Sequence, residues 1–180
     1  MKLTLKGKAW IFGDNLTTDV AIFPSTLSRG GGHDPESLRK VVMAGVDPDF
    51  PKKVHPGDII VAGKRFGQGN PHVWGFYGIA AHGIGVVAES IARGGYRNAV
   101  TAGVPFIPEA EGITKKIKQG DELEVNFKTG EIKNITSGKI IKAEPLPKEL
   151  LDIIEAGGEE AFLEKKFATK SKPKTRSAAK

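Results

Sequence analysis

The amino-acid sequence predicts an α/β protein in which a parallel sheet is followed by a small C-terminal antiparallel meander and helices. Up to Pro108, short apolar runs alternate with helical segments, which is the order of parallel strands joined by helices. After Gly112, short alternating segments are separated by turns, as in a meander. Residues 147–167 then have the periodicity of amphipathic helices.

The predicted strands are short, and several are continuously apolar, which indicates burial on both faces of the sheet. The expected strands of the parallel sheet are residues 6–13, 59–62, 85–90 and 104–108. The expected strands of the meander lie within residues 121–127, 130–136 and 139–144. Residues 20–24 form a further short apolar run of undecided type.

Four segments have helix signals. In the first, Asp34 is a suitable N-cap, Pro35 suits the first turn and Gly45 marks the end. The expected helices are residues 34–45, 71–82, 91–103 and 147–167, the last broken at Gly157-Gly158. Three consecutive glycines, Gly30–Gly32, argue against regular structure before the first of them.

Composition excludes several kinds of chemistry. The 180 residues are enough for one domain with a real core, and they include no cysteine. Disulfides, cysteine nucleophiles and iron–sulfur or thiolate-zinc sites therefore cannot come from this chain alone. The four histidines form no HxxxH pair, so no metal site is expected. No apolar run approaches the roughly 18 residues that span a membrane. We expect no membrane association and a cytoplasmic location.

The positive charge gathers at the C-terminus. The net charge is +6, and residues 169–180 contain five Lys or Arg residues and no acid. We interpret residues 1–167 as the folded domain and 168–180 as a disordered basic tail. Weak, non-specific binding to nucleic acid is the alternative, which the absence of interleaved aromatic residues disfavours.

The segment "RFGQGNPHVWGF" (65–76) is the main candidate site. Gly67 and Gly69 allow the backbone to approach a ligand, and the segment follows the carboxyl end of the predicted strand 59–62. These features favour a carboxylate or phosphate site. The alternative is local: Asn70 as N-cap and Pro71 as first residue can simply begin a helix. The pattern lacks the Gly-Lys-Ser/Thr of a P-loop.

Three ordered stretches resemble the small subunits of isopropylmalate dehydratase, the swivelling domain of the aconitase superfamily. They are "FGDNLTTDVAIFP", "DPESLRKVVMAGVDPDFPKKVHPGDIIVAGKRFGQG" and "VVAESIARGGYRNAVTAGVPFI". The resemblance implies a β/β/α swivelling domain that docks on a large subunit carrying a [4Fe–4S] cluster, whose open iron acts as a Lewis acid. It also implies a hydro-lyase for hydroxy-dicarboxylic acids, as in leucine biosynthesis.

The glycine segment departs from the family pattern. Family members usually have "FG.GSSREHA" here, in which the first serine is the base and the arginine binds a substrate carboxylate. In this chain the corresponding residues are Asn70, Pro71 and His72. Asparagine is not a base, so three hypotheses remain: His72 transfers the proton with Asn70 bonding a substrate oxygen, the large subunit supplies the base, or catalysis is lost. At a helix start, the dipole would favour a neutral His72.

Other positions follow the family more closely. Asp19 matches an aspartate near the active site, with a turn-forming role as the alternative. Arg29 lies in the segment that sets specificity and can bind a carboxylate, or it is a solvated loop residue. Ser90, Arg97 and Asn98 are interpreted as structural hydrogen-bonding residues. The predicted function is a hydro-lyase small subunit; the alternative is a non-catalytic swivelling subunit that regulates or scaffolds its partner.

Overall fold

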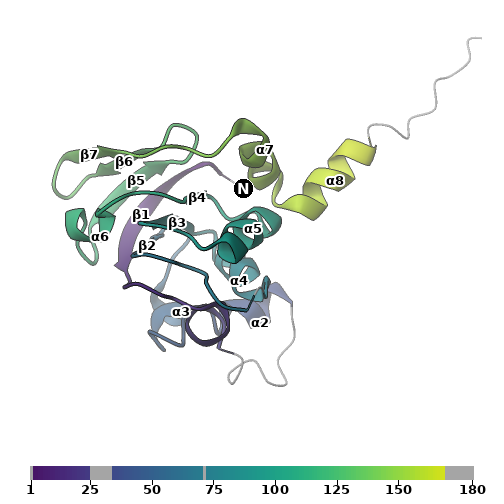
Figure 1. The fold of residues 1–180 in the computed structure, drawn as a ribbon, viewed down its shortest axis with the longest axis horizontal. Helices are drawn as coiled ribbons and strands as arrows, with labels where there is room; N and C mark the ends of the chain where they lie inside the picture. Colours follow the sequence, from purple (N-terminus) through teal and green to yellow (C-terminus); the bar gives the residue numbers. More distant parts are fainter. Residues whose placement is uncertain (1, 25–33, 71, 169–180) are drawn as a thin grey trace, which may run out of the picture.

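The computed structural model describes residues 2–24, 34–70 and 72–168. Its centre is a mixed seven-stranded sheet in the order β4-β3-β2-β1-β5-β6-β7 (Figure 1). The strands are β1 (Thr4–Ile11), β2 (Ile59–Ala62), β3 (Gly85–Ala88), β4 (Phe106–Ile107), β5 (Glu122–Asn126), β6 (Glu131–Asn134) and β7 (Lys139–Lys142). The predicted α/β class with a C-terminal meander is confirmed.

Strand β1 joins the two halves of the sheet. It runs parallel to β2, with Ala9 opposite Ile59, and antiparallel to β5, with Leu5 opposite Val125. The meander β5–β7 is therefore not a separate small sheet. It extends the parallel sheet through one long shared strand, which the sequence pattern did not indicate.

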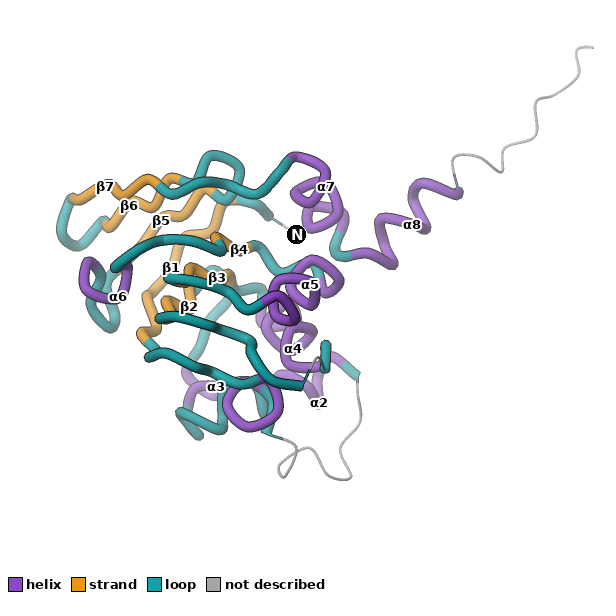
Figure 2. The backbone as a smooth tube through the Cα atoms, in the orientation of Figure 1, coloured by secondary structure: helices purple, strands orange, loops and turns teal. Residues whose placement is uncertain are grey.

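Helices flank the parallel half of the sheet. They are η1 (Thr18–Ile22, a π-helix), α2 (Pro35–Arg39), α3 (Phe50–Lys53), α4 (Trp74–His82), α5 (Arg93–Ala102), α6 (Ile113–Lys116), α7 (Lys148–Ala156) and α8 (Glu159–Ala168). Helices α4, α5 and α7 pack on one face, and α6 packs on the opposite face. Helices α2, α4, α5 and α7 form a row in which each contacts the next (Figure 2). Helix α8 extends away from the body after the predicted break at Gly157-Gly158 (Figure 1).

The continuous apolar strands bury both faces. On β2, Ile60 belongs to the core cluster under the helices, whereas Ile59 and Val61 belong to a second cluster on the opposite face. Successive side chains of a strand point to opposite faces, so a strand between two cores has no polar alternation. This explains why β2 matches the predicted strand 59–62.

Two helix predictions need correction. Asp34 is the N-cap of α2, as expected, and accepts from the backbone N–H groups of Glu36 and Ser37. The helix ends at Arg39, however, and not at Gly45. The reason is tertiary: the N–H of buried Met43 donates to the carbonyl of Ile22 in η1 (2.7 Å), and Met43 adopts a left-handed φ of 58°. The helix predicted for 71–82 begins at Trp74.

The first residue of the predicted basic tail 168–180 is the last residue of α8, and residues 169–180 lie outside the described residues. Within the part of the chain that the structure describes, no helix combines the length and apolar character needed to cross a membrane.

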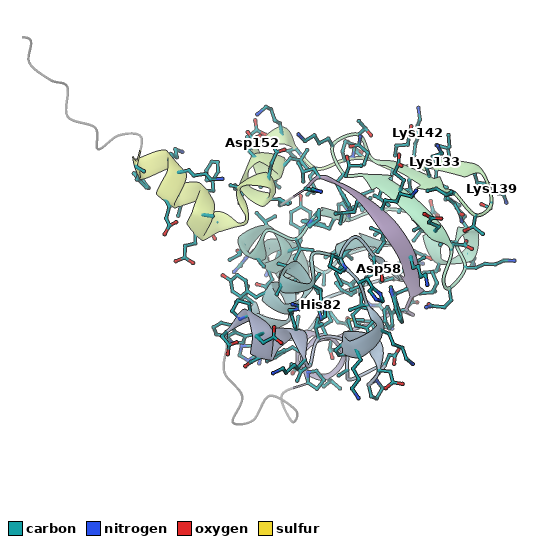
Figure 3. All side chains as sticks on the ribbon, turned by 180° about the vertical axis from the view of Figure 1, so that it is seen from behind. Asp58, His82, Lys133, Lys139, Lys142 and Asp152 are labelled. Carbon is teal, nitrogen blue, oxygen red and sulfur yellow. The ribbon has the colours of Figure 1, made fainter. Side chains whose placement is uncertain are left out.

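His82 is a buried histidine at the end of α4, with 3% of its surface exposed (Figure 3). Its Nε2 lies 2.9 Å from the carbonyl oxygen of Arg39, so Nε2 carries the proton and donates it. Its Nδ1 is buried without a hydrogen-bond partner among the described residues. Burial lowers the pKa of the imidazole below its usual 6.5; the bond to the Arg39 carbonyl opposes this shift, and the guanidinium of Arg39 adds to it.

We expect His82 to make the subunit less stable in mild acid. Because the folded-state pKa is below the unfolded value, the unfolded chain binds the proton first, and stability falls as the pH drops from about 6.5 through the folded-state pKa. His82→Gln keeps an N–H donor but does not titrate. Urea unfolding at pH 7.5 and 5.5 should show a smaller acid loss in this variant than in the wild type. Equal losses would contradict the assignment.

Candidate active site

The carboxyl ends of the parallel strands meet at one edge of the sheet and are tied together there. After β2, the N–H of Lys64 donates to Asp14 Oδ1 after β1 (2.7 Å). The N–H of Arg65 donates to the hydroxyl of Ser90 after β3 (2.9 Å), and the N–H of Phe66 donates to the Ser90 carbonyl (3.0 Å). Ligands of open α/β sheets collect at this edge.

The glycine segment lies along the loop that leads into η1. Thr17 and Gln68 form a parallel β-bridge, and the N–H of Thr18 donates to the Gln68 carbonyl (2.9 Å). The Thr18 hydroxyl donates to the carbonyl of Asn70. Two segments about 50 residues apart in sequence are therefore joined side by side: the expected anion segment, and the loop that leads to Asp19 in the first turn of η1, called the Asp19 loop below.

Gly67 and Gly69 have different roles. Both have positive φ, 71° and 90°. A Cβ on Gly67 would lie 2.9 Å from Gly95 Cα and from Phe76 Cζ, so this glycine allows close packing on α5 and the core. A Cβ on Gly69 would meet Asp19 Oδ1 at 3.5 Å, an ordinary contact distance, and Gly69 is exposed. Of the two glycines, only Gly69 is open to a ligand, and it lies beside Asp19.

Asn70 and His72 are exposed at the end of this segment. The prediction that Asn70 caps the following helix is wrong, because Val73 occupies the N-cap and the Asn70 carbonyl accepts from Thr18 and from the His72 N–H (2.9 Å). His72 therefore lies before α4 and outside its first turn, which weakens the helix-dipole argument. Its carbonyl accepts from Asn98 Nδ2 (3.1 Å).

Of the three expected hydrogen-bonding residues, Ser90 and Asn98 have that role, and Arg97 is exposed on α5. Asn98 is buried and holds the His72 backbone from α5. Ser90 holds the backbone of Arg65 and Phe66. Arg29 lies outside the described residues. Asp19 is half-buried in the first turn of η1.

Sequence reasoning missed a pair of residues at the strand ends. Asn15 and Arg65 both have left-handed φ, 63° and 59°, and Arg65 Nε donates to Asn15 Oδ1 (2.6 Å). Asparagine tolerates this backbone conformation, so Asn15 carried a weak signal. Arginine has no such preference, and nothing in the sequence pattern indicated the conformation of Arg65.

The candidate site combines exposed basic side chains with one carboxylate. Lys64, Arg65 and His72 are exposed at its edge, with the Asp19 carboxylate beside Gly69. In the described residues, no group of three or more His, Cys, Asp or Glu side chains is arranged to hold a metal ion. Cationic side chains of this kind are suited to acid groups, and an imidazole or a carboxylate is suited to proton exchange.

Comparison with known proteins identifies the relatives. The chain is 50% identical over 169 residues to the isopropylmalate/citramalate isomerase small subunit of Methanocaldococcus jannaschii, covering 93% of this chain and 98% of the relative. It is 41% identical to the 3-isopropylmalate dehydratase small subunit of Aquifex aeolicus, covering 94% and 100%. A scan against protein-family models finds no match.

A solved structure shows the same fold. The crystal structure of 3-isopropylmalate dehydratase from Methanocaldococcus jannaschii superposes with a TM-score of 0.85 at 39% identity, covering 93% of this chain and 98% of that chain. The fold is therefore that of a swivelling small subunit of the aconitase type. The chain belongs to the family of 3-isopropylmalate dehydratase small subunits, and it is the small subunit of a heteromeric hydro-lyase.

Proposed function

We propose that this chain completes the active site of a hydro-lyase for a substituted malate, together with an aconitase-like large subunit. The observation that supports this most is the joining of the Gln68–Asn70 segment to the Asp19 loop at the carboxyl ends of the strands. It presents an open glycine, a carboxylate and exposed cationic groups on one edge. Relatives are named for isopropylmalate and citramalate, which are diacids with a hydroxyl group.

The [4Fe–4S] cluster that the family implies does not fit this chain. The chain has no cysteine, and the described residues contain no alternative metal-binding group. In our proposal the cluster belongs to the large subunit, where it would supply Lewis-acid chemistry. The small subunit contributes substrate contacts and proton transfer.

In this proposal His72 accepts the proton that the family's serine takes elsewhere. A neutral imidazole has one nitrogen that can accept a proton, whereas the Asn70 amide can only form hydrogen bonds. The His72 backbone is held on both sides, by Asn70 and by Asn98, and the residue is exposed. Asn70 would bond a substrate oxygen, and Asp19 would orient groups beside Gly69.

We expect His72→Ala, in the reconstituted two-subunit enzyme, to lower kcat by about 10²-fold or more while KM changes little, because general-base catalysis contributes about 10²–10⁴-fold. Steady-state kinetics at several pH values would measure it. His55→Ala is the control, because His55 is an exposed histidine in the turn before β2. Wild-type turnover in the His72 variant would rule out His72 as the base.

A non-catalytic subunit is the second candidate, favoured by the replacement of the family's serine and arginine by Asn70 and His72. The two candidates are separated by anaerobic co-purification with the cognate large subunit and a hydration assay on a panel of hydroxy-diacids. Turnover supports the enzyme. No turnover on any substrate, with an intact cluster in the complex, supports a regulatory or scaffolding subunit.

A further inference from the structure

We propose that Arg65 binds a carboxylate of the diacid substrate and that Asn15 is its positioning residue; this inference rests on the proposed function. The family's carboxylate-binding arginine has no counterpart at position 72, where the chain has histidine. Arg65 is an exposed arginine on the same glycine segment, at the carboxyl end of β2.

The backbone of this pair is held in an unfavourable conformation. Asn15 and Arg65 follow β1 and β2, and both have φ near +60°. Non-glycine residues rarely adopt this left-handed region, and each residue that does so lowers the stability of the folded chain. A strained backbone conformation persists where the surrounding structure fixes it, and residues in such conformations are common at functional sites.

Hydrogen bonds among the ends of three strands fix the backbone of Asn15 and Arg65. The Asn15 N–H donates to the Lys64 carbonyl (2.8 Å), and the Arg65 N–H donates to Ser90 Oγ (2.9 Å). The Lys64 N–H donates to Asp14 Oδ1 (2.7 Å). The arginine backbone is thus fixed by β1, β2 and β3 together, so its side chain starts from a defined point.

The side chain is oriented but its charge is not neutralised. Arg65 Nε donates to Asn15 Oδ1 at 2.6 Å, which leaves the two terminal NH₂ groups of the guanidinium available. Among the ion pairs of the described residues, none includes Arg65. A planar guanidinium held at one nitrogen can still present two parallel N–H groups to a carboxylate.

The pair adjoins the open part of the glycine segment. Gln68 Nε2 donates to the Asn15 carbonyl (3.3 Å), and Gln68 forms the bridge to Thr17. The next residue is Gly69, which lies beside Asp19. Lys64 is also exposed here, but among the described residues no side-chain hydrogen bond or ion pair orients it, and an ammonium group lacks the paired geometry of a guanidinium.

The test uses the reconstituted complex with citramalate as substrate. Arg65→Asn removes the charge and suits a left-handed backbone, so the fold should be kept. We expect KM to rise about 10- to 100-fold with kcat within about threefold, because the lost contact is a charge-assisted pair present in ground and transition states. Lys133→Gln, which removes an exposed charge on β6 in the meander, should leave both unchanged.

Asn15 is tested by two variants. Asn15→Gly loses the acceptor without adding strain and should raise KM several-fold. Asn15→Asp keeps an acceptor oxygen but adds a carboxylate that pairs with the guanidinium of Arg65, so it should also raise KM, at an unfolding midpoint close to the wild-type value. A purely structural role for Asn15 would lower the unfolding midpoint of Asn15→Gly and would leave the KM of Asn15→Asp at the wild-type value.

Binding of malonate, a diacid that cannot be dehydrated, is measured on the same complexes by calorimetry. One outcome is that the wild-type complex binds malonate, that Arg65→Asn lowers the malonate affinity at least about tenfold, and that no substrate turns over. In that case the proposed function fails and the role of Arg65 stands. If the wild type turns over but Arg65→Asn has wild-type KM and malonate affinity, the role of Arg65 is wrong and the function stands. A complex that shows neither turnover nor malonate binding overturns both the proposed function and the role of Arg65.

Discussion

Replacing Asp58 by alanine is expected to destabilise the subunit by about 3–5 kcal/mol, because it leaves three N–H donors without their charged acceptor. Asp58 is 3% exposed and lies beside β1 (Figure 3). Its carboxylate accepts from the Lys8 N–H (2.8 Å), Trp10 Nε1 (2.9 Å) and the His55 N–H (3.0 Å). One side chain therefore ties the turn before β2 to β1, where the two halves of the sheet join.

The packing around Asp58 requires a glycine on the neighbouring strand. A Cβ on Gly7 would lie 2.6 Å from Asp58 Oδ1, so the glycine of β1 makes room for the carboxylate.

Urea unfolding at neutral pH measures the loss of stability expected for Asp58→Ala. The control is Asp152→Ala, because Asp152 lies on α7 with its side chain 43% exposed and pairs with Lys148 at the surface. Similar losses in both variants would show that the buried donors find other acceptors.

The parts of the fold that could be predicted are those decided by local chemistry. The strand Ile59–Ala62 is apolar at every position because it separates two cores, and Asp34 caps α2 through its own side chain. The pairing of β1 with both β2 and β5 could not be predicted in the same way. It depends on register between segments far apart in the chain, for which the sequence carries no local signal.

The two wrong helix boundaries have a common cause. In both, a backbone group bonds to the η1 region instead of continuing or capping a helix: the Met43 N–H to the Ile22 carbonyl, and the Asn70 carbonyl to the Thr18 hydroxyl. Cap residues and apolar spacing describe what a segment prefers alone. Cap residues and apolar spacing carry no information about a hydrogen bond from another part of the chain that packs against the segment.

The sequence indicated where the candidate site begins but not its details. The predicted strand 59–62 placed the glycine segment at the carboxyl end of β2, and the structure brings this segment against the Asp19 loop. The Asn15–Arg65 pair was hidden, because an arginine with positive φ results from the strand-end hydrogen bonds and not from its own preference. Only the structure connects the absence of the family's arginine at position 72 with the presence of an arginine at position 65.

The conformation of the glycine segment itself is expected to depend on Gly67. Gly67→Ala should destabilise the subunit by about 2–4 kcal/mol, from a strained positive φ and an overpacked contact. The new methyl group would meet Gly95 Cα and Phe76 Cζ at 2.9 Å, and the backbone of α5 cannot yield as a flexible side chain can. Since the segment would shift away from α5, kcat/KM of the reconstituted enzyme should fall as well.

Gly69→Ala is the matched control, because it has the same kind of strain without the clash. Its φ is 90°, and its nearest contacts would be 3.5 Å or more, so we expect a loss of only about 1 kcal/mol. Gly95→Ala tests the contact from the other side. Alanine favours a helix over glycine by about 1 kcal/mol, yet its methyl group would lie 3.0 Å from Gly67 Cα. A stabilised Gly95→Ala, or equal losses for Gly67→Ala and Gly69→Ala, would show that strand-end hydrogen bonds alone hold the segment.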